Sequence, residues 1–220
     1  VDAHLIYCAQ MVLVALSNAP EGIPTDIIDA VERVSRPHVL VLAALMHDIG
    51  KGYGHGHSAR GAAMASEAAR RMLWKREDRI DLGFLVQEHL SMMVISQRRD
   101  LEDLELIHRF AARVETTERL DMLFVLSYAD AVTTGPEAFT DWKAALLREL
   151  YQRTRAAIHG GAGLDAIAKR AAARVNDLVE RSGDLGSRFR ELASEFPHRH
   201  LVSHRFELLK RHFNALEEVK

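Results

Sequence analysis

The chain has 220 residues, of which 48% are apolar, and its formal net charge is −2. This length and apolar fraction suffice for a sizeable buried core, and the slightly negative charge argues against a basic surface for nucleic acid. No apolar run reaches the ~18 residues of a membrane span, and the single cysteine, Cys8, excludes an internal disulfide framework and suits a reducing compartment, so we expect a cytoplasmic protein without a membrane segment.

Apolar residues recur at helical spacing almost throughout the sequence. The chain begins with Val1 rather than Met, so we expect a piece of a longer protein. In the first hundred residues, helices are expected where an apolar face follows a capping residue or a proline, at 2–17, 25–34, 37–48, from Ser58 onward and at 77–91. Ser58 is the expected cap of the fourth helix. The stretch MMVISQRRD at 92–100 is expected to form an extended connection.

Further helices are expected in the second half, at 103–114, 117–130, 136–158, 164–182 and 184–195, with Pro197 opening a last segment. The glycine-rich HGGAG at 159–163 marks a loop after the third of these helices. The sequence shows no repeat and no convincing strand pair. We therefore predict an all-α fold, with a first domain at 1–158 and a helical extension at 159–220.

The most informative stretch is LAALMHDIGKGYGHGH at 42–57. An apolar helix ends there in the adjacent pair His47 and Asp48, and a glycine-rich loop with Lys51 and His57 follows. Burying an imidazole and a carboxylate together costs several kcal/mol unless they are paired or bound to a metal. Two interpretations are open at this point: a satisfied pair in the core, or half of a metal site.

Six polar residues on or at the ends of apolar helices can share one centre, and these are His4, His47, Asp48, His57, His89 and Asp130. Imidazole and carboxylate ligands suit Zn²⁺, Mn²⁺ or Fe²⁺ better than Ca²⁺ or Cu⁺. Four of the residues would hold one ion, and all six would hold two ions at the ~3.5–4 Å spacing of two-metal hydrolases. Taken singly, the same residues fit ordinary roles: His4 can be a core histidine, His57 an exposed loop residue and Asp130 a helix-end residue.

The order of His4, the His47-Asp48 pair and Asp130 on separate helices resembles the HD superfamily of metal-dependent phosphohydrolases. HDIGK at 47–51 is close to the central signature of that family, and HSARG at 57–61 and VQEHL at 86–90 resemble the additional ligand segments of its two-metal members. Three longer segments, which cover most of residues 40–154, are similar to a narrower family, the PII uridylyltransferase/uridylyl-removing enzymes. These segments are MHDIGKGYGHGHSARGA, LVQEHLSMMVISQRRDLEDLELI and YADAVTTGPEAFTDWKAALLRELYQRT.

This resemblance implies an HD-domain helical bundle that binds one or two divalent ions, Mn²⁺, Fe²⁺, Zn²⁺ or Mg²⁺, through the six residues above. The implied reaction is hydrolysis of the phosphodiester that joins UMP to a tyrosine of the PII nitrogen-signalling protein, with glutamine as a candidate effector. Asp48 and Lys51 would be catalytic, and Lys51, Arg98 and Arg99 would contact the phosphate or the partner. Residues 159–220 resemble the region before two regulatory ACT domains, which we expect to lie outside this chain.

One position departs from the family pattern. Gly56 stands before His57, where the family commonly has an aspartate, and this leaves the outer support of His57 open and allows a site with a single ion. Three other functions stay open beside uridylyl removal. The chain can be another HD enzyme acting on a nucleotide or alarmone, a non-catalytic HD domain that senses a ligand such as glutamine, or a structural helical module.

Overall fold

The structure is a computed structural model, and it describes residues 2–17, 22–52, 56–98, 100–135, 139–160 and 175–177. Contacts within the chain divide it into two units, Val1–His159 and Gly160–Lys220. All the helices named below belong to the first unit, and residues 175–177 of the second unit are helical. The assignment of the first unit as a catalytic domain and of the second as an extension stays a prediction.

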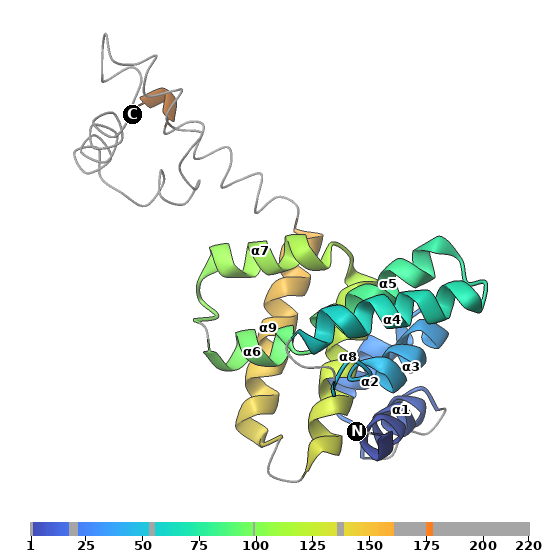
Figure 1. The fold of residues 1–220 in the computed structure, drawn as a ribbon. Coiled ribbons are helices and arrows are strands. Elements are labelled where there is room, and N and C mark those ends of the chain that lie inside the picture. Colours follow the sequence, from blue (N-terminus) through green and yellow to red (C-terminus); the bar gives the residue numbers. More distant parts are fainter. Residues whose placement is uncertain are drawn as a thin grey trace. The chain divides into compact units, whose positions relative to one another are not determined.

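Every regular element in the described ranges is an α-helix (Figure 1), which confirms the predicted all-α fold. In chain order the helices are α1 (Asp2–Ala15), α2 (Thr25–Glu32), α3 (Pro37–Met46), α4 (His57–Arg71), α5 (Arg76–Glu88), α6 (Ser91–Arg98), α7 (Leu104–Val114), α8 (Thr117–Thr134) and α9 (Asp141–His159). In this described part of the chain, no helix combines the length and the apolarity that a membrane span requires.

The core is built around α8, which is buried on all of its sides. Every residue from Leu120 to Ala129 is buried, and this stretch includes the polar Asp121 and Ser127. A helix that is buried all round lies at the centre of a fold, and α8 accordingly packs against α1, α2, α3, α5, α6, α7 and α9. Figure 1 shows α8 in yellow-green beside α9 in orange. Because Asp130 directly follows this stretch, the core helix carries its carboxylate into the interior of the bundle.

The helix α3 brings the His47-Asp48 pair into the same interior. Pro37 stands in its first turn, where the fixed φ of proline suits the start of a helix. Leu40, Ala43 and Ala44 are fully buried, and the helix packs against α1, α5 and α8. The small alanines allow neighbouring helices to approach closely, so the end of α3 lies in the interior of the bundle.

The predicted extended connection at 92–100 is wrong, because residues 91–98 form the helix α6. The β-branched Val94 and Ile95 favour an extended chain when they are considered locally. Met92 and Ser96 are four residues apart and both buried, and the helix packs against α8 and α9. Burial of this helical face therefore outweighs the local preference of the backbone.

Several helix ends also differ from the prediction. Ser58 lies inside α4 and does not cap it, because the N-cap is Gly56 in a left-handed conformation with φ of 78°. The helix α8 runs on to Thr134, so Asp130 lies one turn inside the helix rather than at its end, and α9 begins at Asp141 rather than near residue 136. The helices predicted at 164–182 and 184–195 and the segment from Pro197 lie outside the described residues, apart from helical residues 175–177.

Candidate metal centre

His47 and Asp48 follow α3 directly and are almost fully buried, with 0% and 2% of their surfaces exposed. The Nδ1–H of His47 donates a hydrogen bond of 2.9 Å to the carbonyl oxygen of Ala44, one turn back. Such a bond fixes both the tautomer and the orientation of an imidazole. Neutral His47 therefore presents the lone pair of its Nε2 atom to the interior of the bundle.

His4 from α1 and Asp130 from α8 meet His47 at this point. The Nε2 atom of His4 lies 3.2 Å from the Nε2 atom of His47 and 3.0 Å from Oδ1 of Asp130. The Nε2 atom of His47 lies 3.4 Å from the same Asp130 oxygen. Ligand atoms about 2.0–2.1 Å from a common Zn²⁺-like ion are about 3.0–3.4 Å from one another. The spacing of these three side chains therefore fits a shared metal ion.

A second group forms on the other side of Asp48, with His57 from α4 and His89 at the end of α5. Oδ1 of Asp48 lies 3.4 Å from Nε2 of His89 and 3.8 Å from Nε2 of His57. The Nδ1–H of His89 donates to the carbonyl oxygen of Val86 at 2.7 Å, so its Nε2 atom also faces inward as a lone pair. All three inward-facing atoms are buried, and none has a hydrogen-bond partner among the described residues.

Asp48 belongs to both groups. His4, His47 and Asp48 each offer a ligand atom within 4.8 Å of the others, and so do Asp48, His57 and His89. The carboxylate of Asp48 directs Oδ2 toward His47, at 3.6 Å from Nε2, and Oδ1 toward His89. If two ions were bound, a carboxylate placed between these two sets of imidazoles would offer one oxygen to each.

The charges of the site favour a bound cation. Burial alone would raise the pKa of the Asp48 carboxyl, but His89, Lys51 and His47 together hold that pKa well below its usual range. Burial would also raise the pKa of Asp130 and lower that of His47, yet their mutual attraction outweighs it and gives a lowered pKa for Asp130 and a raised pKa for His47. Both carboxylates are therefore ionised at neutral pH, and a metal ion must compete with a proton for His47.

Glycine at position 50 lets the turn that follows α3 and carries His47 and Asp48 touch the start of α4. A Cβ atom on Gly50 would lie 2.1 Å from the backbone oxygen of His57 and 2.8 Å from the backbone nitrogen of Gly61. Both neighbours are backbone atoms and cannot rotate away, so only glycine fits there. This close approach fixes His57 relative to the turn that carries Asp48.

Lys51 lies beside the centre. Its ammonium forms an ion pair with Oδ2 of Asp48, and 48% of its side chain is exposed. The predicted contacts of Arg98 and Arg99 with the phosphate or the partner protein stay predictions. The side chain of Arg98 and the whole of Arg99 lie outside the described residues.

Thr133 is a residue of this site that the sequence analysis did not single out. Its Oγ1 atom lies 3.4 Å from Nδ1 of His4, and its hydroxyl donates to the carbonyl oxygen of Ala129 at 2.7 Å. The hydroxyl oxygen is therefore positioned to accept the Nδ1–H of His4, which leaves the His4 Nε2 lone pair for a metal. The only signal in the sequence is that Thr133 follows Asp130 by three residues and so shares its helix face.

Comparison with known proteins identifies the family to which this chain is similar. The model of the HD domain family matches residues 13–135. This range contains five of the six candidate ligands, namely His47, Asp48, His57, His89 and Asp130, and begins after His4.

Curated relatives carry the name bifunctional uridylyltransferase/uridylyl-removing enzyme. The chain is 43% identical over 131 residues to the one from Ectopseudomonas mendocina, with 60% of this chain and 15% of the relative covered. It is 36% identical over 171 residues to the one from Rhodospirillum rubrum, with 77% of this chain and 18% of the relative covered. It is 32% identical over 185 residues to the one from Azospirillum brasilense, with 84% and 20% covered. The chain therefore spans a fifth or less of the length of these relatives.

Proposed function

Because this chain belongs to the HD domain family, whose members are divalent-metal phosphohydrolases, we propose that it is a phosphodiesterase that removes UMP from a uridylylated protein. The names of the curated relatives support uridylyl removal as the reaction. The substrate we propose is the uridylylated PII nitrogen-signalling protein, with the UMP–tyrosine phosphodiester as the bond that is cleaved. In this proposal the chain supplies the removing activity of a longer enzyme.

One observation carries the proposal. Oδ1 of Asp48, Nε2 of His57 and Nε2 of His89 are buried together without a hydrogen-bond partner in the described ranges. Each unsatisfied buried polar atom costs roughly 1–3 kcal/mol, and native proteins rarely leave such atoms in a cluster. A divalent cation accepts all three lone pairs at once, so it removes this cost where a water molecule or a neighbouring side chain does not.

We propose His4, His47, Asp48 and Asp130 as the ligands of one ion and Asp48, His57 and His89 as the ligands of a second. The backbone carbonyls of Ala44 and Val86 hold the rings of His47 and His89 with Nε2 inward. Bound divalent ions supply a water molecule activated near neutral pH and positive charge for the oxygens of the phosphodiester.

The side chains around the centre have complementary tasks. Asp48 stays ionised because His89, Lys51 and His47 keep its pKa low, so it holds its place between the two imidazole groups without a proton. Lys51 is half-exposed and paired with Asp48, and its ammonium would bind a non-bridging oxygen of the substrate phosphate as a point charge. This contact would hold the phosphate next to the ligand cluster while the tyrosine oxygen leaves.

The proposal is tested by incubating the chain with uridylylated PII and Mn²⁺ and measuring released UMP. We expect release by the unchanged chain, none by the His47→Ala/Asp48→Ala double variant, and unchanged release by His38→Ala, which alters an exposed histidine of the same helix α3. A parallel screen of free nucleotides identifies an enzyme of different specificity. Release of UMP by the double variant, or turnover of free nucleotides without release from PII, would contradict the proposal.

A further inference from the structure

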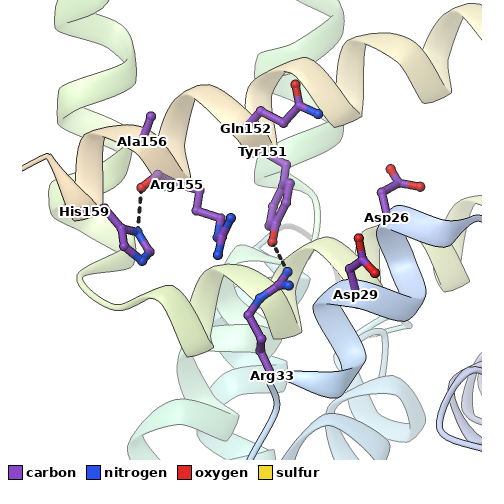
Figure 2. Close-up of a pocket in the computed structure, with 8 residues that line it drawn as sticks. All are labelled: Asp26, Asp29, Arg33, Tyr151, Gln152, Arg155, Ala156 and His159. Atoms are coloured by element: carbon purple, nitrogen blue, oxygen red, sulfur yellow. Dashed lines mark hydrogen bonds between the residues drawn. The ribbon is translucent and has the colours of Figure 1, made fainter.

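A second site with charged walls lies between α2 and α9, away from the metal ligands. It is a cavity of about 390 Å³, and its lining includes Asp26, Asp29 and Arg33 on one side and Tyr151, Arg155 and His159 on the other (Figure 2). None of these residues belongs to the two ligand groups around Asp48. The hydrolysis proposed for the metal centre therefore does not involve this cavity.

One wall of the cavity is a fixed network in which the partly exposed Arg33 is held by the buried Asp121 and Tyr151. Arg33 donates from Nε and Nη2 to the two oxygens of Asp121 at 3.1 and 3.2 Å, and from Nη2 to the hydroxyl of Tyr151 at 2.6 Å. The Tyr151 hydroxyl in turn donates to Asp121, and its ring stacks on Phe124 with centroids 4.2 Å apart. Asp121 and Tyr151 are 1% and 5% exposed. The guanidinium of Arg33 is thus held in one orientation, and its Nη1 atom donates to no described residue.

Arg155 enters the cavity from α9, and the part of the chain that the structure describes holds no partner for its guanidinium. Figure 2 shows the Arg155 side chain extending from α9 toward Arg33. Its Nε atom is buried and has no hydrogen-bond partner within the described part of the chain. A guanidinium stays charged at any physiological pH, and a buried donor without an acceptor costs roughly 1–3 kcal/mol. The position of Arg155 therefore calls for an acceptor that the described residues do not provide.

The acidic residues of the lining do not provide this acceptor. Asp26 is engaged by Arg148, which donates to its two oxygens at 2.7 and 3.3 Å. Asp29 is exposed, and Figure 2 shows it on the far side of Tyr151 from Arg155. His159 lies next to Arg155, and its Nδ1–H donates to the Arg155 carbonyl oxygen at 3.0 Å, which leaves its Nε2 atom for another partner. With its proton on Nδ1, neutral His159 presents Nε2 as an acceptor, so the donors described at this end of the cavity are the guanidinium groups of Arg155 and Arg33.

We propose that this cavity is a binding site for a small molecule that carries a phosphate or carboxylate group, held between Arg155 and Arg33. Two oxygens on one anionic group match the fork of a guanidinium, and such charge-assisted pairs are the strongest hydrogen bonds available to a protein. Asp29 at the opposite side accepts a hydroxyl or amine of the same molecule. The site is independent of the metal centre and of the reaction proposed for it.

The proposal is tested by NMR on the full chain, through the Nε–H resonance of Arg155 and the backbone amide of Ala156. Inorganic phosphate and acetate are titrated separately. We expect a saturable shift of both resonances with at least one of the two anions. A response to phosphate alone assigns a phosphate ester as the ligand class, and a response to acetate alone assigns an organic acid.

Matched variants decide whether the response belongs to the cavity. In Arg155→Gln the affinity read from the Ala156 amide should fall about 10-fold or more, and in Arg155→Lys it should fall less because the charge remains. Arg153→Gln, which removes an arginine paired with Glu149 on the same helix, should leave the affinity unchanged, as should Asp48→Asn in the metal centre. The proposal is overturned by the absence of a saturable shift with either anion, by an unchanged affinity in Arg155→Gln, or by loss of the response in Asp48→Asn.

Discussion

The Nε2 atom of His89 lies 3.4 Å from Oδ1 of Asp48, and both atoms are buried without a hydrogen-bond partner among the described residues. A carboxylate oxygen and an imidazole lone pair repel one another at this distance unless a proton or a cation lies between them. The Nδ1–H bond of His89 to Val86 fixes which ring atom faces the carboxylate.

The two ligand groups should lose their ions separately. His57→Ala removes a ligand from the group of Asp48, His57 and His89, and His4→Ala removes one from the group of His4, His47 and Asp48. Each variant should retain one Mn²⁺ where the unchanged chain binds two, because the other group stays complete. Calorimetric titration with Mn²⁺ measures the stoichiometry. An unchanged number of bound ions in His57→Ala would contradict the proposal that His57 helps to bind a second ion.

Gly50→Ala should weaken the metal centre through the backbone. The added methyl group would lie 2.1 Å from the His57 backbone oxygen, so the start of α4 must move and carry His57 away from Asp48. Overpacking of this kind typically costs about 1–3 kcal/mol. Thermal unfolding and Mn²⁺ titration measure both effects.

Gly52→Ala is the matched control for this change. Gly52 has φ of 98°, so an alanine there is strained, but an added Cβ meets no atom within 4 Å. It should lower stability without changing Mn²⁺ affinity. Equal losses of Mn²⁺ affinity in the two variants would show that strain of the loop, and not contact with His57, controls the centre.

Lys51→Met should separate metal binding from turnover. The methionine keeps most of the unbranched stem of the side chain and removes the ammonium, which pairs with Asp48 and is half-exposed. We expect Mn²⁺ binding to persist, because none of the proposed ligands is lost, and kcat for UMP release to fall about 10-fold or more, as for loss of one charged contact to a phosphate. A change in Mn²⁺ affinity with kcat intact would instead make Lys51 a support for Asp48 alone.

Tyr151 should make the fold sensitive to alkali. Burial, together with the hydrogen bond and the negative charge of Asp121, raises the pKa of Tyr151 to about 12 in the folded chain, whereas an unfolded tyrosine titrates near pH 10. The folded state holds the proton more tightly, so this stabilisation is complete below about pH 10 and is lost as the pH rises toward 12. The loss is at most about 3 kcal/mol.

Denaturant unfolding between pH 9 and 12 measures this effect. Tyr151→Phe should be less stable at neutral pH, because Asp121 and Arg33 lose a partner, and it should show a flatter decline in alkali. Tyr7→Phe changes an exposed tyrosine and should keep the decline of the unchanged chain. An equally steep decline in Tyr151→Phe would assign the alkaline sensitivity to other groups.

The structure confirms the predicted all-α class and brings the six candidate ligands close together, and both have a physical reason; metal binding by these six residues stays a prediction. Apolar residues at helical spacing determine which helix faces are buried, and His47, His89 and Asp130 sit on or next to such faces, so burying the faces brings the polar groups together. The distances around Asp48 then follow from packing among α1, α3, α4, α5 and α8 rather than from any local pattern.

Other features could not be read from local pattern. The helix α6 contains the β-branched Val94 and Ile95, and only its burial against α8 and α9 makes it helical. The cavity between α2 and α9 depends on Arg33 and Arg155, which are far apart in the chain and meet only through tertiary packing. Thr133 was missed because a threonine at the end of a helix has many ordinary roles.

Equilibrium dialysis against Mn²⁺ followed by elemental analysis tests the proposed metal centre most directly. The chain and its Asp48→Asn variant are compared, since this change keeps the shape of the side chain and removes the charge that both ligand groups share. We predict two ions in the unchanged chain and none in Asp48→Asn, with the helical circular dichroism of both intact. Equal metal content in the two proteins, or none in the unchanged chain at saturating Mn²⁺, would contradict the account.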